Sequence, residues 1–207
     1  MSDNDSDDLG ELPKVLENIP RGFVSGWDDD NDDIDDEPNP HETPYKEILW
    51  AAENGNLNVV KALIESDSSL VNITDKDGYT PLHRACYNNH VEVVEYLLKN
   101  GADHCARTID NWQPLHSACK WNSAKSAAKL LSFGANVNAI SKGGLTPLHL
   151  AAGNSYAKEC IELLLMNDDI DPDIKNEANE RAVDIALRSG RYGQLFEIVE
   201  PCFKMKW

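Results

Sequence analysis

Three histidines recur at a fixed interval and are the side chains in this sequence that most readily suggest chemistry. His83, His116 and His149 each end a Pro-Leu-His triplet, and successive triplets lie 33 residues apart. Imidazoles bind metals and transfer protons. If each interval forms one stacked structural unit, neighbouring imidazoles lie about 10 Å apart, which is too far to share a metal ion at bond lengths of about 2 Å. We therefore expect each imidazole to hydrogen-bond the backbone of the neighbouring turn.

The cysteines are not spaced for a metal site either. The chain has five cysteines and no Cys-x-x-Cys pair, which is typical of neither a zinc site nor a disulfide framework. Cys86 and Cys119 lie 33 residues apart at positions for small residues, and we expect them to be buried, inert thiols. The sequence shows no nucleophile paired with a base and no phosphate-binding loop. We expect a non-enzymatic protein with no cofactor and no metal.

The elements that position these histidines follow from the motif around them. Proline fits the first turn of a helix, the residue before it can cap that turn, and a second helix follows, as in the apolar pattern from Val91 to Leu98. Gly101 and Gly134 stand where such second helices end. The four copies of the motif, at spacings of 33, 33 and 35 residues, are Thr80-Pro81-Leu82-His83, Gln113-Pro114-Leu115-His116, Thr146-Pro147-Leu148-His149 and the altered Arg181-Ala182-Val183-Asp184.

This periodicity, with its Thr-Pro-Leu-His core, resembles the ankyrin-repeat family over residues 45–200. The resemblance implies an all-α solenoid of helix-turn-helix units with short β-turn tips. The first unit lacks the Thr-Pro and the histidine, and the last carries arginines at apolar or neutral positions, so we expect both to be capping repeats. The predicted units are an N-terminal capping repeat at 45–78, internal repeats at 79–111, 112–144 and 145–179, and a C-terminal capping repeat at 180–201, followed by a tail at 202–207.

Residues 1–44 differ sharply in charge from the rest of the chain. They hold 15 acidic residues against two basic ones, a net charge of −13 out of −17 for the whole chain. We expect this region to be disordered, because it cannot bury enough apolar surface to offset its ordering entropy. Net acidity argues against direct nucleic-acid binding. Without an apolar membrane span or a signal peptide, we expect no membrane contact and a location in the nucleus or cytoplasm, with the nucleus favoured.

The acidic region also holds an apolar pattern that could form a helix on a partner, followed by an acidic run at residues 28–37. Its residues are Leu12, Val15, Leu16, Ile19, Phe23 and Trp27. Several roles stay open for it. It could make the protein a transcription coregulator, shield a basic nuclear protein in the manner of a chaperone, fold back on the lysines of the repeats, or only solubilise the chain.

The family resemblance implies a protein partner, bound by the turn tips and by the concave side of the first helix of each unit. Mapping this pattern onto the chain predicts partner contacts from Lys76, Tyr79, Arg84, Tyr87, Asn88, Trp112, Lys120, Trp121, Lys142 and Leu145. Aromatic rings flanked by cations are typical of binding hot spots. We therefore expect a monomeric adaptor. The alternative for Trp112 and Trp121 is that each ring only packs on a neighbouring repeat.

Two asparagines have separate predictions. Asn138 matches loop asparagines that an asparaginyl hydroxylase modifies in proteins resembling this family, and its ordinary role would be turn hydrogen bonding. Asn111 stands where the turn usually has glycine, so we expect it to adopt a left-handed conformation, which asparagine tolerates.

Overall fold

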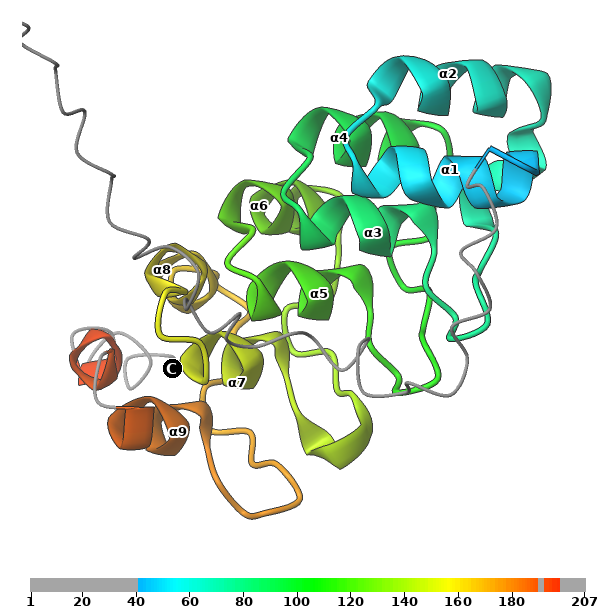
Figure 1. Cartoon of the computed structure of the whole chain (residues 1–207). Coiled ribbons are helices and arrows are strands. Elements are labelled where there is room, and N and C mark those ends of the chain that lie inside the picture. The colour runs from blue at the N-terminus through cyan, green and yellow to red at the C-terminus, as the bar shows by residue number, and fades with distance from the viewer. Residues whose placement is uncertain (1–40, 190–191, 198–207) are drawn as a thin grey trace, which may run out of the picture. The chain divides into compact units, whose positions relative to one another are not determined.

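The computed structural model describes residues 41–189 and 192–197, in which helices stack in two rows (Figure 1). The inner row, in which each helix packs on the next, consists of α1 (Pro44–Glu53), α3 (Pro81–Tyr87), α5 (Pro114–Lys120), α7 (Pro147–Ala152) and α9 (Ala182–Ser189). The outer row consists of α2 (Leu57–Ser66), α4 (Val91–Lys99), α6 (Ala124–Ser132) and α8 (Lys158–Leu165). Two 3₁₀ turns, Ser68–Asn72 and Lys142–Gly144, lie in the connections. The predicted all-α solenoid of helix pairs is confirmed, whereas the predicted tail motif and acidic run lie outside the described residues.

The Thr-Pro-Leu-His motif starts an inner helix, as predicted. Thr80 and Thr146 are extended residues before α3 and α7, and the hydroxyl of each accepts a hydrogen bond from the backbone N–H of the histidine three residues later. Proline occupies the first turn, where its missing N–H would have no partner in the helix.

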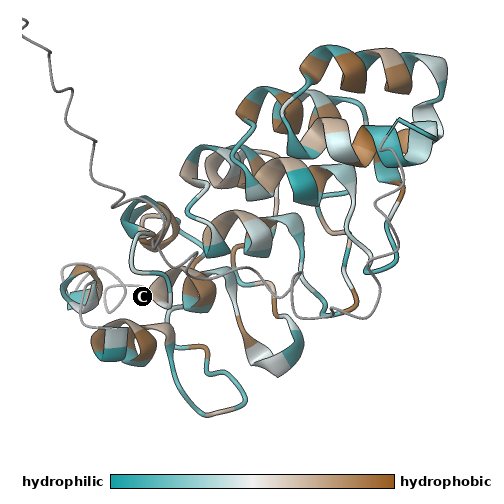
Figure 2. Cartoon of the chain, viewed as in Figure 1, coloured by the Kyte–Doolittle hydropathy of each residue, from teal (hydrophilic) through white to brown (hydrophobic). Residues whose placement is uncertain are grey.

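Leucine and small residues of the inner helices form the core with the apolar faces of the outer helices. Leu82, Leu115 and Leu148 are almost fully buried, and a leucine buried to this extent stabilises the fold by about 1.5–3 kcal/mol. Ala85 and Ala118 have no exposed surface where the inner helices approach one another. Figure 2 shows apolar and hydrophilic residues alternating along the helices, while the loop before α9 is largely hydrophilic.

Four turns of the same design precede α3, α5, α7 and α9. In each, the residue two positions before the cap of the helix has a positive φ, which glycine and asparagine tolerate best; these residues are Gly78, Asn111, Gly144 and Asn179. Gly143 in the third of these turns has a positive φ as well. The predicted left-handed conformation of Asn111 is confirmed, with φ of 58°. Backbone hydrogen bonds of 2.9 Å join each turn to the next, for example from Ile109 N to Asp77 O.

The two terminal units depart from the predicted pattern in an instructive way. The prediction that the first unit lacks a Thr-Pro helix start was wrong, because Thr43 and Pro44 start α1, and the Thr43 hydroxyl accepts from Lys46 N at 3.3 Å. The motif was missed because it stands three residues earlier than in the internal repeats, which lengthens the helix. In the last unit Asp184 replaces the histidine, and its carboxylate accepts from Arg181 N at 2.8 Å.

Candidate protein-binding surface

The three histidines join adjacent repeats, as predicted. His83 Nδ1 accepts from Thr80 N at 3.2 Å, and its Nε2 donates to the Trp112 carbonyl of the next repeat at 3.1 Å. His116 and His149 make the equivalent bonds to the carbonyls of Leu145 and Glu180, at 3.2 and 3.1 Å. In the part of the chain that the structure describes, no group of three His, Cys, Asp or Glu side chains is arranged to hold a metal.

Burial fixes the protonation state of these imidazoles. Desolvation lowers the pKa of His83 and of His116 to about 4, against the small opposing effect of the accepting carbonyls, and it lowers the pKa of His149 as well. Both ring nitrogens of His83 are in use only when the ring is neutral and carries its proton on Nε2, since Nδ1 must accept from an N–H. The histidines are therefore structural bridges.

The cysteines of the inner helices are buried as well, in surroundings that keep their thiols protonated. Cys86 and Cys119 have no exposed surface, and burial raises the pKa of both thiols well above the usual range. A thiol that stays protonated is a poor nucleophile and a poor metal ligand. The prediction of buried, inert thiols is confirmed.

The functional surface therefore has to be sought in exposed positions of the inner row. We call the four turn tips together with the exposed positions of α1, α3, α5, α7 and α9 the inner face. Tyr79 and Trp112, at equivalent tip positions, are both half-buried, and each ring lies against the histidine of its own repeat. The ring centroids are 5.6 Å apart for Tyr79 and His83 and 6.5 Å apart for Trp112 and His116. Both tip aromatics thus shield a buried imidazole as well as facing outward.

Two predicted contact residues are engaged within the scaffold. The Arg84 guanidinium pairs with Glu53 at 3.0 Å and with Asp75 at 2.8 Å, so it links the first repeat to a turn tip. The side-chain amide of Asn88 donates to the Glu53 carbonyl at 2.8 Å. Arg84 and Asn88 therefore join neighbouring repeats through these bonds.

Tyr87 and Trp121 form an aromatic pair across the junction between the second and third repeats. Their ring centroids are 4.8 Å apart with an interplanar angle of 57°, and both residues are half-buried. Tyr87 ends α3, and Trp121 directly follows α5. Large rings at this spacing offer a partner apolar area at low cost in side-chain entropy.

Trp121 occupies a position that carries asparagine in the repeats on either side. Asn88 and Asn154 each donate an amide hydrogen bond to a carbonyl of the preceding repeat, at 2.8 and 2.7 Å. The equivalent carbonyl for Trp121 belongs to Tyr87, and there the Ser123 hydroxyl donates at 3.1 Å, as His90 does beside Asn88 at the first junction. The Tyr87 carbonyl therefore keeps one hydrogen bond, and Trp121 does not supply the second.

The remaining predicted residues are three lysines and one leucine. Lys142 pairs with Asp110 at 3.7 Å, with both side chains largely exposed. Leu145 is half-buried and accepts the histidine bond through its carbonyl. Lys76 is exposed and Lys120 is half-buried, and among the described residues no carboxylate forms an ion pair with either ammonium.

Asn138 lies on the opposite side of the repeats and clamps a junction there. Its amide donates to Asp169 O at 2.7 Å, and its carbonyl oxygen accepts from Asp171 N at 2.9 Å. Asn72 makes the same two bonds at the first junction, whereas Cys105 takes this position at the second. Turn hydrogen bonding was the ordinary role expected of Asn138, but its bonds to the next repeat and those of Asn72 were not predicted, although the spacing of 33 residues relates all three positions. Hydroxylation of Asn138 stays a prediction.

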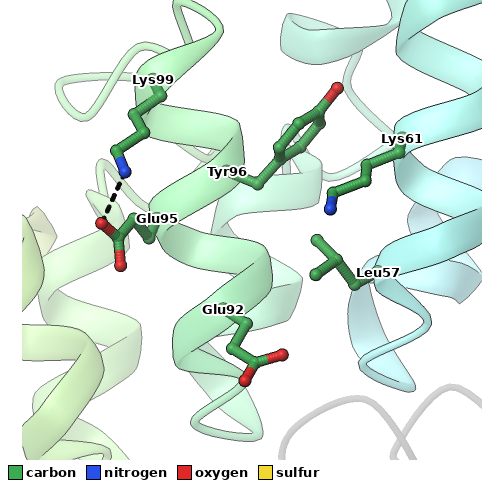
Figure 3. Close-up of a pocket in the computed structure, with 6 residues that line it drawn as sticks. All are labelled: Leu57, Lys61, Glu92, Glu95, Tyr96 and Lys99. Carbon is green, nitrogen blue, oxygen red and sulfur yellow. Dashed lines mark ion pairs between the residues drawn. The ribbon is translucent and has the colours of Figure 1, made fainter.

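A shallow hollow of about 210 Å³ lies between the outer helices α2 and α4 (Figure 3). Lys61 stands over the Tyr96 ring with its Nζ 5.6 Å from the centroid. Glu95 pairs with Lys99 at 2.8 Å and with Lys129 at 3.3 Å. These charged side chains interact with one another across the helix surface. The residues that line the hollow include no nucleophile paired with a base.

Comparison with known proteins agrees with this architecture. A family model described as ankyrin repeats in three copies matches residues 32–108 and 104–176. The chain belongs to the ankyrin-repeat family. Over 196 residues, which cover 89% of this chain and 82% of each relative, it is 52% identical to ankyrin repeat domain-containing protein 49 of Bos taurus and 48% identical to that of Homo sapiens. The Drosophila melanogaster protein of the same name is 44% identical over 107 residues, half of each chain.

Members of the ankyrin-repeat family typically mediate protein–protein interactions, and this membership implies a protein partner for the chain. The names of these relatives refer to the repeats and to no reaction. In the helices that the structure describes, no stretch is both long and apolar enough to span a membrane.

Proposed function

We propose that the protein is a non-enzymatic adaptor that binds a protein partner on the inner face, with the Tyr87 and Trp121 pair at the centre of the interface. The observation that supports this most strongly is the loss of an amide clamp at Trp121. Asparagine at this position serves the fold in two other repeats, and the tryptophan gives up that bond for a half-buried ring. Departures from a local structural rule are expected where function demands them.

The experiment compares two variants of the same junction in cells. Trp121→Asn restores the inner asparagine and removes the indole, while Cys105→Asn restores the outer asparagine on the opposite side. Quantitative crosslinking mass spectrometry on the full-length chain should show partners that are lost at least tenfold with Trp121→Asn and retained with Cys105→Asn. Equal recovery from both variants would refute the assignment of the inner face.

The acidic region supports a second candidate function, binding of a basic protein. Its charge of −13 within 44 residues provides strong attraction for a basic surface, sensitive to salt. This proposal would cover both a shield for a basic nuclear protein and a coregulator that docks through the tail. Neutralising the acidic run at residues 28–37 with asparagine and glutamine should abolish such binding and leave Trp121-dependent partners in place. Salt-sensitive partners that do not depend on Trp121 and are still bound after this change would exclude the second function.

A further inference from the structure

The inner face has one position where a side chain is missing without a structural reason. In the five units of the inner row, the same repeat position holds Glu53, Tyr87, Lys120, Gly153 and Arg188. Gly153 directly follows α7 and has φ of −77° and ψ of −12°, a right-handed conformation that every residue adopts easily. The backbone therefore does not require glycine here.

Packing does not require glycine either. A Cβ atom at residue 153 would lie 3.7 Å from the carbonyl oxygens of His149 and Leu150 and 3.8 Å from Cγ2 of Ile185, which are ordinary contacts. Glycine is also less favourable than alanine in a helix. The chain thus leaves an open position on the inner face, bordered by the backbone of α7 and by Ile185.

Cationic side chains lie on both sides of this open position. The Asn154 amide donates to the Lys120 carbonyl at 2.7 Å, which places Lys120 directly across the junction from the end of α7. In the described ranges 41–189 and 192–197, no carboxylate pairs with the Lys120 ammonium. On the other side, the Arg188 guanidinium pairs with Glu180, so its charge is partly neutralised.

We propose that this open position receives an aspartate or glutamate of the partner protein, whose carboxylate pairs with Lys120. Adjacent apolar residues of the same partner segment then pack on the Tyr87 and Trp121 rings one repeat away. This inference rests on the proposed function and narrows it to a partner segment that combines an acidic residue with an apolar anchor. A half-buried lysine strengthens the pair relative to one in open water, because part of the solvent screening is removed.

The test selects randomised 12-residue peptides displayed on phage against the full-length chain, and counter-selects against Trp121→Asn. Enriched peptides should carry Asp or Glu beside an aromatic or aliphatic residue. The tightest peptide should bind Lys120→Glu and Gly153→Gln at least tenfold more weakly than the unmodified chain. Gly153→Ala, which adds one methyl group in ordinary contact, should bind within twofold. Changing the peptide's acidic residue to lysine should restore binding to Lys120→Glu.

The outcomes separate this inference from the proposed function. Failure to enrich any peptide that depends on Trp121 would overturn both. Peptides that depend on Trp121 but bind Lys120→Glu and Gly153→Gln as tightly as the unmodified chain would overturn only the acidic site. Enrichment of lysine or arginine at the anchor would overturn it in favour of a basic partner. Circular dichroism checks that each variant is folded, and Lys120→Met, which removes charge without reversing it, provides a second variant expected to weaken binding.

Discussion

The junction between the second and third repeats has fewer amide clamps than the junction between the third and fourth. The latter is closed on the outer side by Asn138 and on the inner side by Asn154. The former has Cys105 and Trp121 at these two positions. The same junction carries the half-buried aromatic pair, which is consistent with the proposal that one asparagine position serves recognition in place of the scaffold.

The weaker junction still has several contacts that both junctions share. The His83 Nε2 bond spans it, and Asn89 Oδ1 accepts from Ser126 N across it at 3.1 Å, as Asn122 Oδ1 accepts from Cys160 N at 3.4 Å at the next junction. Packing of α3 on α5 and of α4 on α6 is continuous with the rest of the core. The comparison therefore suggests that buried histidines and apolar packing hold the repeats together, and that the asparagines are the replaceable part.

The largest expected effect comes from acid, which acts on the histidines that both junctions share. For His83 and His116 the folded-state pKa of about 4 lies below the unfolded value of 6.5, so the unfolded chain binds more protons between these pH values. Stability is therefore complete above pH 6.5 and is lost as the pH falls toward 4, by up to about 3 kcal/mol for each histidine. Urea unfolding from pH 7 to 4.5 measures this loss.

The control for the acid effect is His83→Gln, which removes one of the titrating groups. This variant should be less stable than the unmodified chain at pH 7, and its stability should change less over the same pH range. A pH profile identical in slope to that of the unmodified chain would show that His83 does not carry the effect.

The next largest effect is expected from restoring the outer clamp with Cys105→Asn. By the 33-residue spacing, the new amide would face the backbone of Gly134 and Asn136, as Asn72 faces Gly101 and Asp103. Two added hydrogen bonds should raise the free energy of unfolding by about 1–2 kcal/mol. Cys105→Ser, which is too short for both bonds, is the matched control. An equal gain from both variants would mean that the clamp is not the cause.

A smaller effect is expected at the cap of α5, the third-repeat helix that begins at this junction. Gln113 stands where the other two internal repeats have threonine, and its side-chain oxygen is buried without a hydrogen-bond partner among the described residues. Gln113→Thr should restore the hydroxyl bond to the His116 N–H and raise stability by about 1 kcal/mol. Gln113→Ala removes the buried oxygen without adding a hydroxyl. Comparing the thermal unfolding midpoints of the two variants therefore separates the capping bond from the removal of the buried oxygen. Equal midpoints would contradict a capping effect.

The repeat architecture was predictable from the sequence because its cause is local. The proline, the capping threonine and the bridging histidine lie within four residues, and the period relates each copy to the next. The start of α1 was mispredicted because Thr43 and Pro44 lie outside that register. The engagement of Arg84 with Glu53 and Asp75 was not predictable, because both partners come from other segments of the chain.

The same distinction applies to the candidate site. Trp121 was predicted as a partner contact, but the amide bonds that it lacks are known only from Asn88 and Asn154 at equivalent positions. The position of Cys105 was not predictable as a site of interest, because the clamp missing there becomes visible only when the backbone partners of Asn72 are known.

If Trp121 serves binding more than folding, Trp121→Asn should leave the free energy of unfolding almost unchanged. The new amide can share the Tyr87 carbonyl with Ser123, as Asn88 shares the Glu53 carbonyl with His90. This gain should offset the lost ring contact, so we expect a stability within about 1 kcal/mol of the unmodified chain. A loss of about 3 kcal/mol or more, the cost of truncating a core tryptophan, would contradict it.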